Sequence, residues 1–330
     1  MMKSKHTAEI IAYVVIIAFL AFVPAFVKNL YWLGVITTML IHILLTTSFW
    51  LVMTTGQINL GHAGLAAIGG YMSAALVTVY GFNSWLSLPI AIAVAAVVAL
   101  VIGVITLRIT GIYFIITTIA LAEVIKIVFG MWEYPFGGLV GILNIPPANP
   151  LKLPGISPIG FATRPALYYL VLVFVLIGTS VVWRVNRSSV GLIFRGIRES
   201  DKLAEHVGIY TMKFKLVAFV LGSACAALGG VLYTYTTGAM LPTSFTMIQA
   251  NYYLVWAAVG GLGSFAGPLV GTAVLSVLSE FLRPVKEYES IIYAGMLICA
   301  VLVFKGGLVG ASQRMLRLFA AGRKKRNARA

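Results

Sequence analysis

Long apolar runs separated by short polar stretches make up most of this chain. Seven runs are each long enough for one helical membrane crossing, which takes about 20 residues: Ile10–Val27, Leu30–Met53, Ile58–Tyr80, Leu86–Leu107, Ile109–Phe129, Ala166–Trp183 and Phe214–Thr236. The next run, Ile248–Leu282, is too long for one helix and contains Gly260-Gly261-Leu262-Gly263-Ser264, which predicts a hairpin of two short helices. With Ile291–Phe304 as the last crossing, the pattern predicts about ten transmembrane helices.

The composition fits a membrane protein and excludes a soluble enzyme. Of the 330 residues, 60% are hydrophobic and 10% are charged, and the mean hydropathy is +0.99. Soluble domains are nearer half apolar and a quarter charged. We therefore predict an all-α polytopic membrane protein, with residues 1–304 as a transmembrane domain and residues 305–330 as a basic tail.

Basic residues are concentrated in two places along the chain, which predicts its orientation. The chain has 24 basic and 9 acidic residues; residues 184–215 hold seven basic and three acidic ones, and residues 305–330 hold eight basic and no acidic ones. Basic residues collect in cytoplasmic loops, so we predict that the 184–215 loop and both termini are cytoplasmic. This distribution explains the net charge of +15 without nucleic acid, and Arg323–Arg326 fits an orientation signal that also contacts anionic lipid.

Polar side chains and five glycines share the stretch Gly56–Tyr71, at the start of the third run. Irregular backbone at membrane depth is tolerated where protein or a water-filled cavity covers it, so we predict a broken helix that lines a pathway. The alternative is a tightly packed helix interface, and His62 by itself favours a buried, hydrogen-bonded histidine over a proton relay. The candidate pathway residues here are Gln57, Asn59, Gly61, His62 and Gly64.

Two further features bear on the membrane part. The glycine-rich breaks in the third run and before Phe265 suggest a pseudo-repeat of two halves, as in many transporters. Glu123 and Lys126 lie three residues apart on one helical face. They form either a structural ion pair or a pair facing the substrate, and we include Glu123 among the candidate pathway residues.

The 184–215 loop contains a predicted short helix. Ser200 can cap a helix that begins at Asp201, whose charge suits the helix dipole, and Gly208 suits the left-handed position after its end. Such a helix has a small apolar face that needs a partner, either another protein or the membrane helices of its own chain. This face consists of Leu203, Ala204 and Val207.

Several stretches resemble the LivM-type permeases of bacterial branched-chain amino acid ABC transporters. The resemblance covers nearly all of the chain after the first predicted crossing, and in it the Arg198–Ile209 stretch is similar to the family's coupling loop, which contacts the ATPase. The residues that it assigns to coupling are Arg198, Glu199, Asp201, Leu203, Ala204, Val207 and Gly208. The stretches that carry the resemblance are Gly56–Tyr71, Thr110–Glu123, Gly137–Ile142, Gly191–Ile209, Pro242–Thr246 and Gly260–Gly267.

The resemblance implies an importer in the bacterial inner membrane with several other chains. These are a second permease of the LivH type, two cytoplasmic ATPases and a periplasmic substrate-binding protein. The chain has no G-x-x-x-x-G-K-[ST] phosphate-binding motif, so we expect no cofactor on this chain, with ATP bound by the partner subunits. Related permeases carry urea, short amides or other amino acids, and these substrates remain open beside branched-chain amino acids.

Two other classes of function fit the residues less well. An ion-coupled secondary transporter needs intramembrane ionisable residues, and the candidates are few: His42, His62, Glu123 and Glu280, because the one aspartate lies in the 184–215 loop. A membrane enzyme has less support, since the four histidines are scattered and no H-E-x-x-H motif or nucleophile elbow is present. No metal-ligating pattern is present either, and Cys225 and Cys299 lie in apolar runs.

Overall fold

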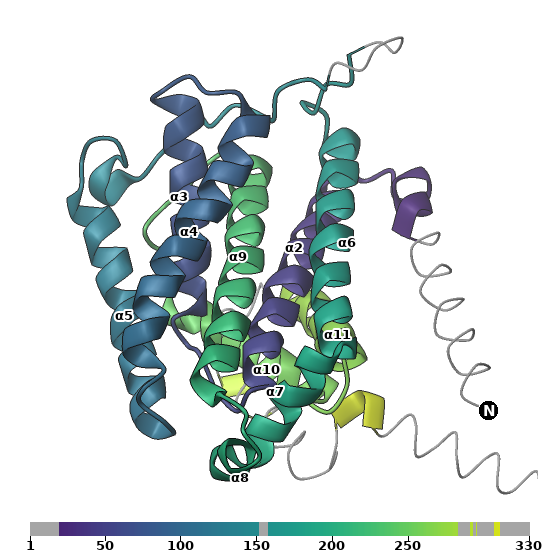
Figure 1. The fold of residues 1–330 in the computed structure, drawn as a ribbon. Coiled ribbons are helices and arrows are strands. Elements are labelled where there is room, and N and C mark those ends of the chain that lie inside the picture. Colours follow the sequence, from purple (N-terminus) through teal and green to yellow (C-terminus); the bar gives the residue numbers. More distant parts are fainter. Residues whose placement is uncertain (1–19, 152–157, 283–290, 293–294, 296–306, 311–330) are drawn as a thin grey trace, which may run out of the picture.

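The protein is a bundle of long helices. The computed structural model describes residues 20–151, 158–282, 291, 292, 295 and 307–310. In this part the regular structure is helical, apart from two isolated bridges that pair Ile142 with Met240 and Leu151 with Ile159. Figure 1 shows the longest helices side by side. The predicted all-α fold is confirmed for the described residues.

Five helices are long and apolar enough to cross a membrane: α2 (Leu30–Met53), α4 (Ser84–Thr106), α5 (Ile112–Met131), α6 (Arg164–Arg187) and α9 (Thr211–Thr237). Three shorter helices pack with them: α3 (His62–Thr78), α10 (Met247–Gly260) and α11 (Ala266–Leu282). The loops contain η1 (Gly138–Val140), α7 (Ser189–Glu199) and α8 (Asp201–His206), and residues 20–26 are also helical.

Local sequence determines where several helices begin and end. The Asn29 side chain accepts a hydrogen bond from the Tyr31 amide at the start of α2, and Asn83 does the same for Trp85 at the start of α4. An asparagine in this position satisfies an amide that has no partner inside the helix. Helix α9 ends before Gly238, whose φ of +69° is left-handed and costs glycine little.

Helix α9 is the central helix of the bundle and contacts α2, α3, α4 and α6. Small residues allow its backbone to approach its neighbours. A Cβ on Gly230 would lie 1.9 Å from the Ala66 carbonyl oxygen of α3, and a Cβ on Gly69 would lie 2.5 Å from the Cα of Ala227. Apolar surface alone does not drive helices together in lipid, so close contacts of this kind stabilise the bundle.

The structure agrees with the hydropathy pattern where residues are described. The predicted hairpin is confirmed, since α10 and α11 pack together and the chain turns at Gly261, with a φ of +116°. The third run becomes helical at His62, four residues after its predicted start. The runs Ile10–Val27 and Ile291–Phe304 and the tail 305–330 lie mainly outside the described residues, so ten crossings and the pseudo-repeat remain predictions.

Candidate functional site

The link between α2 and α3, residues 54–61, is irregular and mostly buried. The side chains of Gln57 and Asn59 are buried in it. The Leu60 amide donates a hydrogen bond to Thr118 Oγ1 of α5, at 3.2 Å. Protein therefore covers this irregular backbone, as the membrane interior requires. The start of the third run is therefore irregular before α3 begins, and the predicted broken helix that lines a pathway stays a prediction.

His62, the first residue of α3, is buried and hydrogen-bonded. Its Nε2 lies 2.9 Å from Ser48 Oγ of α2, and the Phe49 ring packs edge-on against it, with ring centres 5.6 Å apart. Its Nδ1 and the Asn59 Nδ2 have no hydrogen-bond partner among the described residues. The expected buried, hydrogen-bonded histidine is present.

The glycines of this stretch lie in close helix contacts. A Cβ on Gly61 would lie 2.8 Å from the Thr118 carbonyl oxygen, and one on Gly64 would lie 3.2 Å from the Ala122 Cα, both in α5. Close packing, the alternative that the sequence leaves open, is thus present at both positions. A pathway role stays a prediction for Gln57, Asn59, Gly61, His62 and Gly64.

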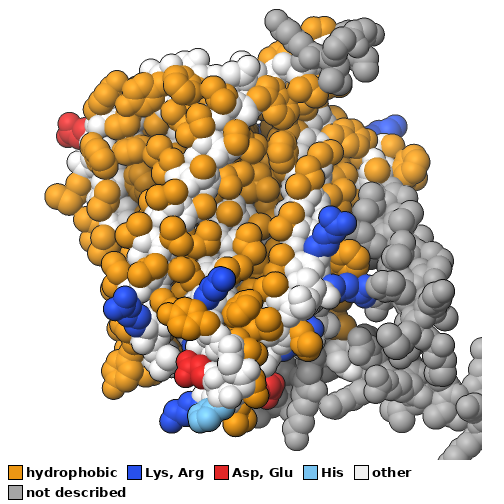
Figure 2. Space-filling view, viewed as in Figure 1, with side chains coloured by type: hydrophobic (Ala, Val, Ile, Leu, Met, Phe, Trp, Pro, Cys, Tyr) orange, Lys and Arg blue, Asp and Glu red, His pale blue; other side chains and the backbone are white. Residues whose placement is uncertain are grey.

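The predicted coupling residues lie at one end of the bundle. Helix α6 leads into α7 and α8 there, and Figure 1 shows both short helices beyond the ends of the spanning helices. Charged and histidine side chains gather at this end, below a broad hydrophobic band (Figure 2). Ser200 Oγ accepts a hydrogen bond from the Leu203 amide, and Gly208 has a φ of +84°. Both predicted caps of the short helix are confirmed.

Two polar contacts fix α8 to the start of α9. Asp201 Oδ2 forms an ion pair with Lys215 Nζ at 2.6 Å, and Lys215 is buried. Glu205 accepts a hydrogen bond from Thr211 Oγ1 at 2.7 Å, and Ala204 is buried. One face of α8 is therefore attached to the central helix of the bundle.

The other face of α8 is apolar and open. Leu203 is 70% exposed and Val207 is 76% exposed, and Tyr210, just after the helix, is 70% exposed. Of the predicted apolar face, Ala204 alone is buried against the helices that the structure describes. The self-packing alternative therefore does not account for Leu203 and Val207.

The end of α7 also lies against the irregular link. Arg198 and Glu199 form the last turn of α7, and a Cβ on Gly56 would lie 3.5 Å from the Arg198 Cα. Gly56 has a φ of +82°, which suits glycine. This contact could not be predicted from the sequence, because no local pattern relates residues so far apart in the chain.

Glu123 and Lys126 form the ion pair that their spacing suggests. Their side chains lie 2.5 Å apart on α5, with Glu123 47% and Lys126 33% exposed. Gly61 and Gly64 contact α5 at Thr118 and Ala122, so the link approaches that helix on its buried side. The structure thus does not bring Glu123 together with the other candidate pathway residues.

A cavity of about 550 Å³ lies at the end of the bundle opposite α7 and α8, between α2, α9, α10 and α11. Three of its lining groups, His42 Nδ1, Trp256 Nε1 and Ser276 Oγ, are buried without a hydrogen-bond partner among the described residues. A buried polar atom left unpaired costs about 1–3 kcal/mol, so we expect water there. His42 and Glu280 stand out in the sequence as intramembrane ionisable residues, but the sequence does not predict the cavity, because its lining comes from separate helices.

These features define a polytopic membrane protein with a charged end that is formed by α7 and α8. A family model described as branched-chain amino acid transport system, permease component, matches residues 31–303. The chain belongs to this family.

Individual relatives are consistent with the family. LivM of Escherichia coli, a high-affinity branched-chain amino acid transport system permease protein, is 27% identical over 281 residues, which cover 80% of this chain and 66% of LivM. LivH of Salmonella typhimurium is 29% identical over 152 residues, 45% of this chain and 48% of LivH. A probable LivH of Methanocaldococcus jannaschii is 23% identical over 80% of this chain and 87% of its own length.

The chain thus spans slightly less than two thirds of the length of the LivM proteins that it matches. The long match to LivM agrees with the expected LivM type. No solved structure matches the chain.

Proposed function

We propose that this chain is a LivM-type permease subunit of an ABC importer that carries branched-chain amino acids across the bacterial inner membrane. The family match and the names of its relatives support this substrate class. A second permease of the LivH type, two cytoplasmic ATPases and a periplasmic binding protein complete the importer. ATP binds to the ATPases, so this chain moves the substrate and catalyses no reaction.

The observation that carries the proposal is the exposed apolar face of α8. Leu203 and Val207 are open on a helix that Asp201 and Lys215 attach to α9. A fixed short helix with exposed apolar side chains at a polar end fits insertion into a groove on a soluble protein. An ATPase docked there would act on α9, the helix that most of the bundle surrounds.

The same docking would also reach the irregular link. The backbone of Arg198 lies against Gly56, so a movement of α7 would displace residues 54–61. We therefore place the inner end of the substrate route beside this link. Gln57, Asn59 and His62 are its polar side chains, and close glycine contacts hold it against α5.

An uptake measurement in the source bacterium tests the proposed function. Deleting the gene should abolish high-affinity uptake of radiolabelled leucine, and a plasmid copy should restore it. Unlabelled isoleucine and valine should compete with leucine, whereas urea and acetamide should not. Unchanged leucine uptake in the deletion strain, under conditions in which the wild-type strain contains the protein, would overturn the substrate assignment.

A further inference from the structure

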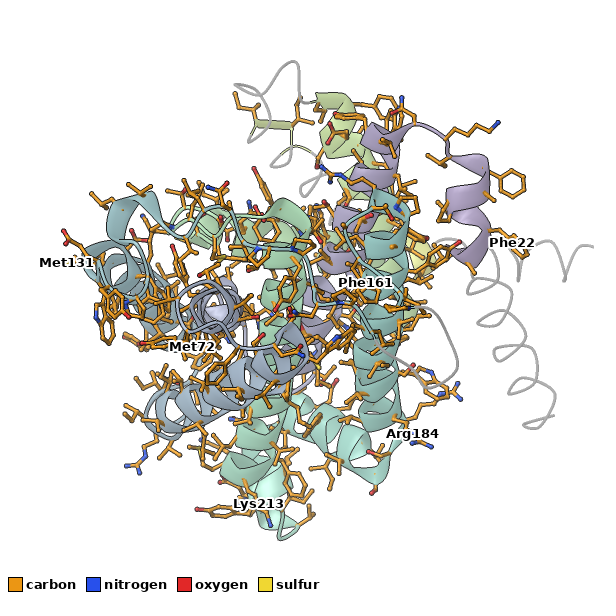
Figure 3. All side chains as sticks on the ribbon, turned by 90° about the horizontal axis from the view of Figure 1, so that it is seen from above. Phe22, Met72, Met131, Phe161, Arg184 and Lys213 are labelled. Atoms are coloured by element: carbon orange, nitrogen blue, oxygen red, sulfur yellow. The ribbon has the colours of Figure 1, made fainter. Side chains whose placement is uncertain are left out.

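Helix α5 is packed mainly on one side and lies at the edge of the molecule. Its main contact is α3, and it touches α4 and α10 only lightly. Viewed along the bundle, Met131 at the end of α5 lies at one edge, and Phe22 lies at the opposite edge (Figure 3). The exposed residues follow one face along the whole helix: Ile112, Tyr113, Ile116, Ala120, Val124, Ile127, Val128 and Met131.

The Glu123–Lys126 ion pair lies beside this exposed face, near the middle of the membrane. Glu123 is eight residues before Met131, about 12 Å along a helix that rises 1.5 Å per residue. The hydrocarbon core is about 30 Å thick. Both side chains are still partly exposed at this depth. Ionisable groups at such a depth usually face protein or a water-filled cavity, because lipid cannot solvate them.

Other exposed faces of the bundle have a different chemistry. On α4 the exposed face includes Val97, Val101 and Ile105, at 60%, 57% and 64% exposure. On α6 it includes Val173 and Ile177, at 53% and 52%. Both faces are apolar at mid-helix and suit lipid. Among the five spanning helices of the described part, α5 alone has a charged pair at mid-helix.

We propose that the exposed face of α5 packs against the second permease of the importer, which closes the Glu123–Lys126 pair off from lipid. The inference rests on the proposed function and names the surface through which the two permeases meet. The occupant is a related permease because relatives of this chain carry two different permease names, LivM and LivH. Its contact helix must offer small or polar side chains at the depth of the ion pair.

Site-specific photocrosslinking in cells that contain the complete importer tests the surface. The photoreactive residue p-benzoylphenylalanine replaces Ala120 on α5, one turn before Glu123. The matched control places it at Val101 on the apolar face of α4. We expect an adduct with the second permease, identified by mass spectrometry, from position 120 and no protein adduct from position 101. A position-120 variant that crosslinks only to lipid, or only to a second copy of this chain, overturns the proposal.

A charge series gives an independent readout in the same cells. Glu123→Ala leaves Lys126 unpaired, and in a protein contact this should reduce the copurified second permease at least tenfold. Adding Lys126→Ala removes the stranded charge and should restore most of the association. If α5 faces lipid, Lys126 can extend toward the interface, and neither variant changes the association. That result overturns the proposal.

The outcomes separate this inference from the proposed function. If leucine uptake depends on the chain but position 120 yields no permease adduct, the surface assignment is wrong and the importer assignment stands. If uptake does not depend on the chain, the substrate assignment is wrong whatever position 120 contacts.

Discussion

Neighbouring side chains of α8 have opposite environments. Ala204 is buried against the bundle, while Leu203 is 70% exposed although it is the more apolar of the two. Together with Val207 and Tyr210, Leu203 forms an exposed apolar patch on a charged end of the molecule, which fits the proposed contact with another protein. The expected effects of substitutions at this helix follow from that contrast.

Replacing Leu203 with Asp should prevent docking of the ATPase. A charge buried without a partner costs several kcal/mol, and 1.4 kcal/mol already corresponds to tenfold in affinity. We expect at least a tenfold loss of copurified ATPase and loss of substrate-stimulated ATP hydrolysis, at normal abundance of the permease. Lys202→Ala is the control and should have little effect. A Leu203→Asp variant with wild-type ATPase association would show that α8 does not couple the two proteins.

Replacing Gly64 with Leu should separate α3 from α5. The Cβ alone would lie 3.2 Å from the Ala122 Cα, so a larger side chain must displace the helix, at about 1–3 kcal/mol. We expect a lower thermal unfolding temperature of the purified protein in detergent and reduced uptake, with the protein still in the membrane. Gly196→Leu, at an exposed position of α7 with open space around it, is the control. Equal melting temperatures for both variants would contradict the packing.

At the scale of elements, the Asp201–Lys215 ion pair is one of the two polar contacts that attach α8 to α9. Asp201→Asn should leave the buried Lys215 without a carboxylate and loosen α8. We expect faster hydrogen exchange at residues 201–207 and weaker ATPase association. The double variant Asp201→Asn with Lys215→Met should recover part of the loss, because the stranded charge is gone. If the effects of the two substitutions are strictly additive, Asp201 and Lys215 do not stabilise the position of α8 through their ion pair.

The sequence predicts elements well where a pattern is local. Hydropathy locates α2, α4, α6 and α9 because each must present an apolar surface over a full membrane crossing. The caps of α8 follow from Ser200 and Gly208, whose chemistry acts within one turn. Helix α7 was not predicted as a separate element, because its amphipathic pattern lies within a charged loop.

Contacts between distant segments leave no such pattern. The approach of Gly56 to Arg198 joins two regions that the sequence analysis treated separately. The cavity between α2, α9, α10 and α11 is lined by polar residues from all four helices, so no single stretch of sequence marks it. The sequence placed Glu123 on a helical face with Lys126, but only the packing of α5 reveals that the pair lies away from the link.

At the scale of the whole molecule, the orientation in the membrane is open to a direct test. We expect the coupling end to be cytoplasmic, because basic residues concentrate in the 184–215 loop and the tail. In a Cys225→Ser, Cys299→Ser background, a cysteine at position 139, which is 85% exposed near the opposite end, should react with an impermeant maleimide in intact cells. Cysteines at positions 202 and 325 should react only after the cells are opened. If the cysteine at position 202 or the one at position 325 is labelled in intact cells, the predicted cytoplasmic location of that segment is wrong.

The glycine contacts of α9 also restrict how this protein can change shape. Gly230 lies against Ala66 and Gly69 against Ala227 with backbone atoms nearly touching. Backbone contacts this close oppose any sliding of α3 along α9. We therefore expect α3 and α9 to move together as one rigid body. In the proposed importer, we expect α3 and α9 to move as one unit relative to the partner chains during transport.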